Sequence, residues 1–120
     1  MKKLEGSQRI SVDAHVLAEI VRRIVEVAQP DQIILFGSAA RDEMTSNSDI
    51  DLLVVKSGPI HRGHLTGEIY MNFLGVRQAV DVVVVTPEDI ERYRNASCLV
   101  IEPVLREGKI IYERGAVSAR

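Results

Sequence analysis

The chain has 120 residues, which is the usual size of one domain and leaves little room for a second. Hydrophobic residues make up 46% and charged residues 27%, a globular composition that excludes an intrinsically disordered chain. The formal net charge of −2 provides no basic field for a nucleic acid backbone, so direct nucleic acid binding is not expected.

The sequence has no segment typical of a membrane protein or of a disulfide framework. No apolar run exceeds four residues, far below the roughly 18 that a membrane span needs. The lysines near the N-terminus are not followed by the apolar region of a signal peptide. Cys98 is the only cysteine, which excludes an internal disulfide and a cysteine zinc cluster. We therefore expect a soluble, cytoplasmic protein that does not bind membranes.

The first third of the chain predicts a helix, a strand and a turn. Over residues 12–28 apolar side chains recur at the helical period, and Ser11 is the expected N-cap. Residues 32–36 form a short segment rich in β-branched side chains, which predicts a strand. A Gly-Ser turn follows, and we expect a short polar helix or a loop over residues 39–44.

Two further strands are predicted in the middle of the chain. Residues 49–56 contain the run LLVV, which is apolar on both faces and indicates a central position in the sheet. Residues 79–86 contain VVVV and predict a second buried strand. A weaker helical pattern over residues 62–74 fills the connection between them. His61 and His64 stand near glycines and a Gly-Pro pair, so we expect a solvated loop there and not a metal site.

The last third of the chain predicts two helices and a strand. Thr86 is a helix cap, Pro87 takes the first helical position, and acids follow in the first turn, so a helix should run to about residue 94. A further helix is expected over residues 97–107 and a final strand over residues 109–112. The predicted order αβαβαβααβ indicates a single α/β domain over residues 1–120.

Two aspartates stand two residues apart where the strand over residues 49–56 begins. Side chains two apart on a strand point to the same face, with Cα atoms roughly 7 Å apart, so Asp49 and Asp51 should share a face. Their negative charges repel each other unless a cation lies between them. Hard oxygen ligands at this spacing suit Mg²⁺ or Mn²⁺.

A third acid, Asp81, stands directly before VVVV, just as Asp51 stands before LLVV. The 29 residues between them are enough for a helical crossover, which would make the two strands parallel neighbours. The three acids would then converge at one edge of the sheet. Rossmann-like folds are disfavoured, because their ligands lie beyond the carboxyl ends of the strands, whereas these acids precede the apolar runs.

Gly37 and Ser38 supply groups suited to a phosphate. Glycine lets backbone amides approach an oxyanion closely, and the serine hydroxyl can donate to a phosphate oxygen. Arg41 could reach a phosphate or could be an ordinary exposed arginine. A Gly-Ser turn or an Asp-x-Asp pair alone is commonly structural, but the two in this order with a third acid favour phosphoryl or nucleotidyl transfer assisted by metal.

The segments GSAARDEMTSNSDIDLLVV and AVDVVVVTPED resemble the minimal nucleotidyltransferases, or MNT family, of the polymerase-β superfamily. That family has Gly-Ser, about ten residues, Asp-x-Asp, and then an acid on a neighbouring strand. The resemblance covers about residues 12–113 and implies a single-domain polymerase-β-like fold, with a mixed β-sheet flanked by helices. One departure is Asp42, where the family commonly has glycine, and it is expected to stiffen or reshape the turn.

The resemblance also implies roles for these residues. Gly37 and Ser38 would form the nucleotide-binding turn, to which we add Arg41 as a candidate. Asp49 and Asp51 would be the metal-binding pair, and Asp81 the third catalytic carboxylate. The implied cofactors are two Mg²⁺ ions, with Mn²⁺ as an alternative. The implied substrate is ATP, from which AMP moves to a hydroxyl while pyrophosphate leaves.

The family further implies a protein partner. Such short proteins are often encoded beside an all-helical HEPN protein, in several cases a toxin RNase, which the nucleotidyltransferase neutralises by attaching AMP. The resemblance is therefore compatible with a hetero-oligomer of this chain and that partner. Two alternatives remain: a non-catalytic antitoxin that acts by occlusion, and an adenylyltransferase of a small molecule, which the absence of room for a second domain disfavours.

Overall fold

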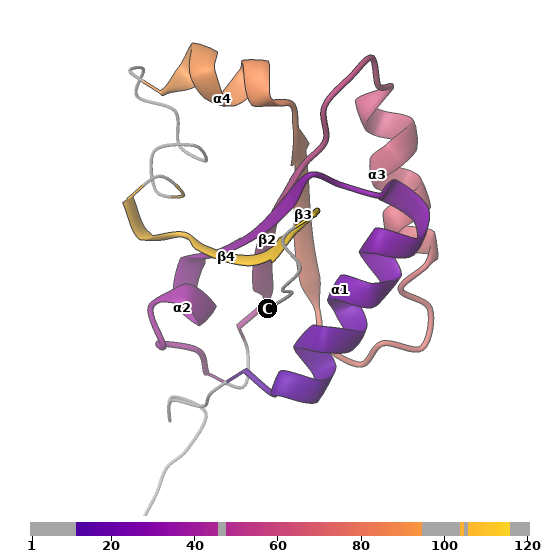
Figure 1. Ribbon diagram of the computed structural model, residues 1–120. Helices are drawn as coiled ribbons and strands as arrows, with labels where there is room; N and C mark the ends of the chain where they lie inside the picture. Colours follow the sequence, from indigo (N-terminus) through magenta and orange to yellow (C-terminus); the bar gives the residue numbers. More distant parts are fainter. Residues whose placement is uncertain (1–11, 46–47, 95–103, 105, 116–120) are drawn as a thin grey trace, which may run out of the picture.

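The computed structural model describes residues 12–45, 48–94, 104 and 106–115. These residues form four helices and four strands that alternate along most of the chain (Figure 1). In chain order they are α1 Ala14–Ala28, β1 Gln32–Phe36, α2 Gly37–Ala40, β2 Ile50–Val55, α3 Arg62–Met71, β3 Val80–Val85, α4 Pro87–Tyr93 and β4 Lys109–Glu113. None of the helices in these segments could span a lipid bilayer, by length or by hydropathy.

The strands form one mixed sheet in the order β3-β2-β1-β4. The two apolar strands β2 and β3 are parallel, and their pairing runs without a shift from Ile50↔Val80 to Val55↔Val85. Strand β1 is antiparallel to both β2 and β4. The predicted parallel crossover and the predicted mixed α/β sheet are therefore confirmed.

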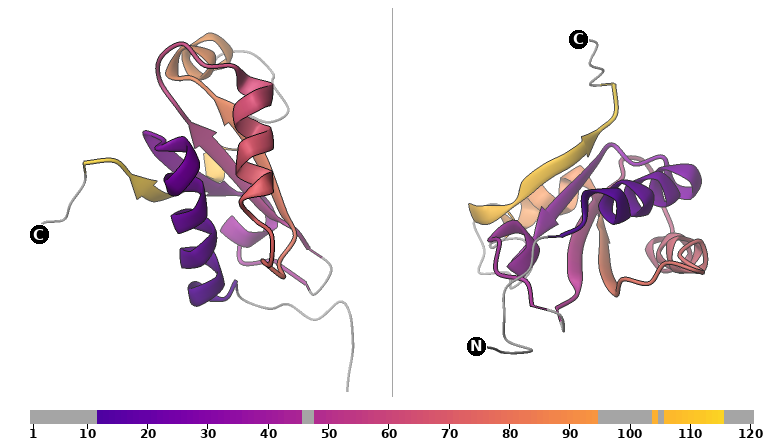
Figure 2. Two further views of the ribbon diagram at one scale, coloured as in Figure 1. Left: turned by 90° about the vertical axis from the view of Figure 1, so that its right-hand side faces the viewer. Right: turned by 90° about the horizontal axis from the view of Figure 1, so that it is seen from below.

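Helices α1 and α3 lie side by side on one face of the sheet (Figures 1 and 2). The main core lies between them and that face, and it includes Ile20 and Ile24 of α1, Ile69 of α3, and Leu52 and Val54 of β2. A smaller cluster lies on the opposite face, where partly buried Ile90 of α4 packs with buried Leu53, Val55 and Val85. This two-sided burial explains why every residue of LLVV is apolar.

Arg23 of α1 joins the two helices through polar contacts. Its Nη1 donates to the backbone carbonyls of Asn72, at 3.1 Å, and Leu74, at 2.7 Å, just beyond the end of α3. Asn72 returns a bond from its amide Nδ2 to the carbonyl of Arg23, at 2.9 Å. The two bonds that Arg23 donates satisfy carbonyls at the end of α3 that would otherwise be left to water.

Tyr70 connects α3 to the outer edge of β3. The backbone N–H of Val82 donates to the Tyr70 hydroxyl at 2.7 Å. The Tyr70 ring also meets Phe73 edge to face, with ring centroids 5.9 Å apart. Helix α3 is thus attached to the strand that follows it.

Several predicted boundaries differ from those of the structure. Helix α1 begins at Ala14, and Asp13 is its N-cap through bonds to the N–H groups of His15 and Val16. Ser11, the expected cap, lies outside the described residues. Over residues 39–44 a short polar helix or a loop was expected; the structure has helix α2, which begins earlier, at Gly37, and ends at Ala40, followed by a turn.

The middle helix is shorter than predicted and begins differently. Helix α3 ends at Met71, not at residue 74, and its C-cap is Asn72. The expectation of a loop at His61 and His64 was wrong for the second: His61 Nδ1 accepts the N–H of His64 at 3.1 Å and caps α3, in which His64 lies. Both histidines are exposed.

The predicted start of α4 is confirmed, and the structure adds detail. Thr86 accepts the N–H of Asp89 at 3.0 Å, and Asp89 accepts the N–H of Thr86 at 3.0 Å, so the two form a capping box behind Pro87. The predicted strand over residues 109–112 is β4. The helix predicted over residues 97–107 lies largely outside the described residues.

Candidate active site

The starts of β2 and β3 bring two of the candidate acids together. Asp51 is paired directly with Asp81 across the parallel strands. Asp49 lies one residue before β2, and the N–H of the intervening Ile50 donates to the carbonyl of Ala79 at 2.9 Å, which fixes the register. Asp49 and Asp81 are exposed and Asp51 is half-buried. The three residues predicted to converge therefore lie at one end of the sheet.

This end of the sheet is the one that carries α2. Helix α2 lies at the lower end of the sheet in Figure 1, and α4, which follows the carboxyl end of β3, lies at the upper end. Strand β1 ends where β2 begins, with Phe36 paired to Asp51. The next residue is Gly37, so the Gly-Ser turn begins directly beside Asp51.

The Asp51 carboxyl is in an environment that disfavours its charge. Burial raises its pKa first, the negative charge of Asp81 raises it further, and that of Asp49 adds to the same effect. The Arg41 guanidinium acts in the opposite direction and lowers the pKa of this carboxyl. A divalent cation between these acids would relieve the repulsion that they experience without one.

Gly37 is in contact with the Asp51 side chain. A Cβ built on Gly37 would collide with Asp51 Oδ2 and lie 3.1 Å from its Cγ. Gly37 also has φ of 74°, in the left-handed region that side chains other than glycine's disfavour. Glycine is therefore required at this position by both the backbone and the acid.

The Ser38 side chain is available to a ligand. Its backbone carbonyl accepts the N–H of Glu43 at 2.8 Å, which closes the turn after α2. Within the segments that the structure describes, its hydroxyl has no hydrogen-bond partner. A hydroxyl that is only half-buried, beside a glycine, is a donor that a phosphate oxygen could use.

Arg41 ends α2 and lies between two glutamates. Its Nε donates to Glu43 Oε1 at 2.8 Å and its Nη1 to Glu107 Oε1 at 3.0 Å. The sequence left open whether this arginine faces a phosphate or only solvent. It lies close enough to Asp51 to influence that carboxyl, and it is held in place. Sequence reasoning did not identify Glu43 or Glu107, because Glu107 is distant in the chain and no motif contains it.

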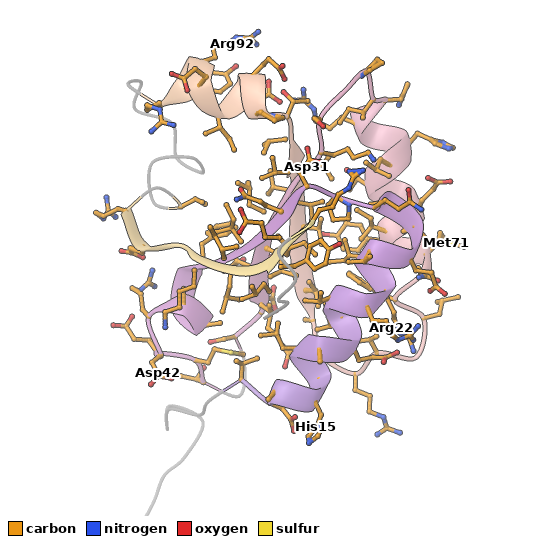
Figure 3. The ribbon with its side chains drawn as sticks, viewed as in Figure 1. His15, Arg22, Asp31, Asp42, Met71 and Arg92 are labelled. Atoms are coloured by element: carbon orange, nitrogen blue, oxygen red, sulfur yellow. The ribbon has the colours of Figure 1, made fainter. Side chains whose placement is uncertain are left out.

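Asp42 follows Arg41 in the turn and has φ of 61°. It therefore adopts the left-handed conformation that a glycine would take without strain. Figure 3 shows the labelled Asp42 at the outside of the molecule, in the turn beyond α2. Asp42, which stands where the family commonly has glycine, therefore lies at a position whose backbone conformation favours glycine.

The candidate carboxylates are of the chemical type that binds a divalent metal, but their side chains are not already arranged as a metal site. Aspartate oxygens are the ligands that Mg²⁺ and Mn²⁺ prefer. The negative charges of Asp81 and Asp49 act on Asp51, and a cation would offset them. In the described part of the chain, however, no group of three or more His, Cys, Asp or Glu side chains is arranged so that it could hold a metal ion.

Two cavities of substantial volume lie elsewhere. One of about 620 Å³ is lined by Val27 of α1 and by Gly67 and Met71 of α3. Another, of about 470 Å³, is lined by residues such as Val55 and Pro87, at the opposite end of the sheet from the acids. Neither is lined by the candidate acids. Asp49 and Asp81 lie on an exposed surface.

Comparison with protein families gives a match over most of the chain. Residues 18–116 match the family model described as polymerase beta, nucleotidyltransferase. This stretch contains the Gly-Ser turn and all three candidate acids. No curated protein matches the sequence.

Solved structures share the fold at low sequence identity. A structure described as a nucleotidyltransferase of Sulfolobus solfataricus has a TM-score of 0.59 and 20% identity, covering 83% of this chain and 79% of that one. A toxin-antitoxin structure with AMP-PNP has a TM-score of 0.53 and 22% identity, covering 81% and 73%. A mutant of the toxin-antitoxin MntA-HpeT has a TM-score of 0.54 and 20% identity, covering 87% and 76%. At these identities the likeness concerns the fold.

Proposed function

The chain belongs to the polymerase beta nucleotidyltransferase family, and on that premise we propose that it is a metal-dependent enzyme that transfers AMP from ATP to a hydroxyl of a partner protein. The observation that carries the proposal is the in-register pair of Asp51 and Asp81, with the Gly-Ser turn delivered against it. This arrangement would place carboxylates for a metal and, at Ser38, a hydroxyl with no partner among the described residues at the same end of the sheet.

In this proposal Asp49 and Asp51 would hold the metal that accompanies the triphosphate, and Asp81 would complete the anionic set from the neighbouring strand. Mg²⁺ or Mn²⁺, two ions by the family resemblance, would supply charge neutralisation and a lower pKa for the acceptor hydroxyl. Ser38 donates to a phosphate oxygen, and Gly37 leaves space for the close approach. The acceptor oxygen would attack the α-phosphorus and release its proton to water, the α–β anhydride bond would break, and pyrophosphate would leave with the electron pair of that bond.

The proposed partner is a HEPN-type toxin, for which this chain would be the antitoxin. Two of the structures with the same fold are described as toxin-antitoxin complexes, and one of them contains AMP-PNP. The exposed positions of Asp49 and Asp81 support a macromolecular acceptor, because a protein surface can reach these two acids from solvent.

The test is a transfer assay with the protein encoded beside this one. That protein is incubated with labelled ATP and Mg²⁺, with either wild type or Asp81→Asn, and its mass is read for added AMP while its toxicity is assayed in parallel. Wild type should add AMP and neutralise, and Asp81→Asn should do neither. Glu88→Gln, an exposed acid at the other end of the sheet, is the charge-matched control and should behave as wild type.

The assay also separates the alternatives. If Asp81→Asn neutralises as well as wild type and no modified partner appears with either protein, the chain acts by occlusion. If the partner is unmodified but a small hydroxylated molecule gains AMP, the acceptor assignment is wrong and the chemistry is retained. If neither neutralisation nor transfer occurs, the proposal fails.

A further inference from the structure

Arg41 is held by two carboxylates from different parts of the chain. Glu43 is its neighbour in the same turn, whereas Glu107 is 66 residues away in sequence, shortly before β4. The two bonds use Arg41 Nε and Nη1. A guanidinium is planar and rigid, so fixing two of its nitrogens fixes the direction of the third.

The third nitrogen, Nη2, has no partner among the residues that the structure describes. The Arg41 backbone is also tied to the candidate site, since its N–H donates to the carbonyl of Gly37 at 3.2 Å. The guanidinium charge reaches Asp51, whose pKa it lowers. Arg41 thus lies close enough to Asp51 to affect its carboxyl, and the N–H groups of its Nη2 have no partner among the described residues.

The position of Glu107 is set by the residue that follows it. A Cβ on Gly108 would lie 2.5 Å from the carbonyl oxygen of Val104 and 2.7 Å from Cγ2 of Ile34 in β1. Only glycine therefore allows this backbone to lie so close to β1. The Gly108 N–H donates to the same Val104 carbonyl at 2.8 Å, which closes a turn and directs Glu107 toward Arg41.

Glu107 engages Arg41 more directly than its other basic neighbour. Its bond from Arg41 is 3.0 Å long, whereas the approach of Arg106 Nη2 to its other oxygen is 3.4 Å. The Arg41 hydrogen bond is also the largest cause that lowers the pKa of the Glu107 carboxyl. The contact between α2 and the segment before β4 is therefore specific.

We propose that Glu107, together with Glu43, is a positioning residue that orients Arg41 so that its open Nη2 meets a phosphate of the bound nucleotide. The inference rests on the proposed function, because it assumes that a nucleoside triphosphate binds at Gly37 and Ser38. Arginine recognises phosphate best through a fork of donors in a fixed plane, and the two glutamates supply that fixation.

A simple charge effect predicts the opposite sign, which makes the proposal testable. Two glutamates near a polyphosphate repel it, so removing one charge should tighten binding if Glu107 has no positioning role. If Glu107 acts through Arg41, removing it should weaken binding. It should also have no further effect once Arg41 is absent, because the two side chains act as a unit.

The experiment is a double-mutant cycle by calorimetric titration with AMP-PNP and Mg²⁺. Wild type, Glu107→Gln, Arg41→Ala and the double variant are titrated, with Glu107→Asp and Glu43→Gln as further variants. We expect Glu107→Gln to weaken binding roughly three- to tenfold in wild type and to change nothing in Arg41→Ala. Glu107→Asp, which keeps the charge and shortens the reach, should also weaken binding. The exposed Glu88→Gln serves as the charge-matched control.

The outcomes separate this inference from the proposed function. If wild type does not bind AMP-PNP with Mg²⁺, the nucleotide site is wrong and the inference fails with it. If wild type binds but Glu107→Gln binds equally or more tightly, only the positioning role is overturned. Equal weakening by Glu107→Gln with and without Arg41 also overturns it, since the effect would then not pass through the arginine. Melting temperatures of all variants show which are folded, and Glu43→Gln keeps the test decisive if Glu107→Gln is not.

Discussion

The Asp51 carboxylate occupies the space that a side chain at Gly37 would need. Strand β1 ends opposite the start of β2, and the turn that follows passes directly over the acid. The glycine of the Gly-Ser motif therefore has a steric role toward the acid, in addition to the role toward a phosphate that we propose for it. A motif residue and a candidate metal ligand thus form one steric unit.

A methyl group at position 37 should disrupt both partners. Gly37→Ala would place a Cβ against Asp51 Oδ2 and force φ of 74° on an alanine, which costs about 1–2 kcal/mol before the collision is counted. We expect a lower melting temperature and loss of the response to Mg²⁺ and nucleotide, both read by thermal unfolding.

Gly67→Ala is the matched control for that variant. Gly67 lies within α3, where an added Cβ would meet nothing within 4 Å, so alanine should stabilise the helix by about 0.5–1 kcal/mol. The two glycine substitutions should therefore have opposite signs. A Gly37→Ala variant as stable as wild type would show that neither the backbone nor the contact with Asp51 requires glycine at position 37.

Ser38→Ala should affect nucleotide binding and leave stability nearly unchanged. The hydroxyl has no hydrogen-bond partner in the described segments, so its removal leaves no buried group unpaired. A bond to a charged phosphate contributes about 1.5–3 kcal/mol. Calorimetric titration with AMP-PNP should show that loss while the melting temperature of the free protein stays constant. Unchanged affinity would place the phosphates elsewhere.

The stability of the metal-free protein should depend on the ionisation of Asp51. Its pKa in the folded state is raised above the ordinary value, first by burial and then by Asp81 and Asp49. The folded state therefore retains a proton that the unfolded state releases, and stability falls as pH rises from the ordinary pKa through the raised one. Asp51→Asn removes this penalty, so without divalent metal it should melt above wild type at pH 7. The difference should close in acid.

Asp31→Asn gives the opposite sign. The pKa of Asp31 is lowered, chiefly by its hydrogen bonds with Ser57 and also by Arg114, so its contribution is present above the ordinary pKa and is lost in acid. This variant should melt below wild type at pH 7.

With Mg²⁺ and nucleotide present, wild type should melt above Asp51→Asn, because we expect only wild type to gain stability from the ligand by mass action. A higher melting temperature of Asp51→Asn under all these conditions would exclude a metal at this carboxylate.

Asp42→Gly should stabilise the turn after α2. Asp42 has φ of 61°, a conformation that costs a residue other than glycine about 1–2 kcal/mol. Part of the gain is cancelled by the greater freedom of glycine in the unfolded chain. We expect a net gain below about 1 kcal/mol in chemical denaturation. Asp42→Val should be destabilising, and a neutral result for both would mean that the turn adjusts its backbone.

The strands could be predicted because their signals are local. The runs LLVV and VVVV are apolar on both faces, and the intervening length fits a crossover, so the parallel pairing of β2 and β3 followed from the sequence. The place of β1 between β2 and β4 did not follow, because a short apolar segment carries no mark of its partners. The helix over residues 62–74 was extended too far because its weak apolar pattern continues past the cap at Asn72.

The candidate site divides in the same way. The positions of Asp51 and Asp81 relative to each other were accessible, because each lies near the start of a strand whose parallel neighbour could be inferred. The contact of Gly37 with Asp51 was not accessible in this way, because it depends on the antiparallel pairing of β1 with β2. The contact of Glu107 with Arg41 was not, since it depends on how closely Gly108 approaches β1. The cap at Asp13 and the capping role of His61 likewise depend on backbone geometry that composition does not contain.

The hydroxyl of Tyr70 also has a consequence for solubility. Strand β3 is rich in valine and forms one margin of the sheet, and such an edge is a template for pairing with another chain and for aggregation. An incoming strand would need the free N–H groups of that margin, and the one at Val82 already donates to Tyr70. Tyr70 of α3 therefore disfavours pairing of β3 with a strand of another molecule. The tyrosine side chain remains partly exposed in this position.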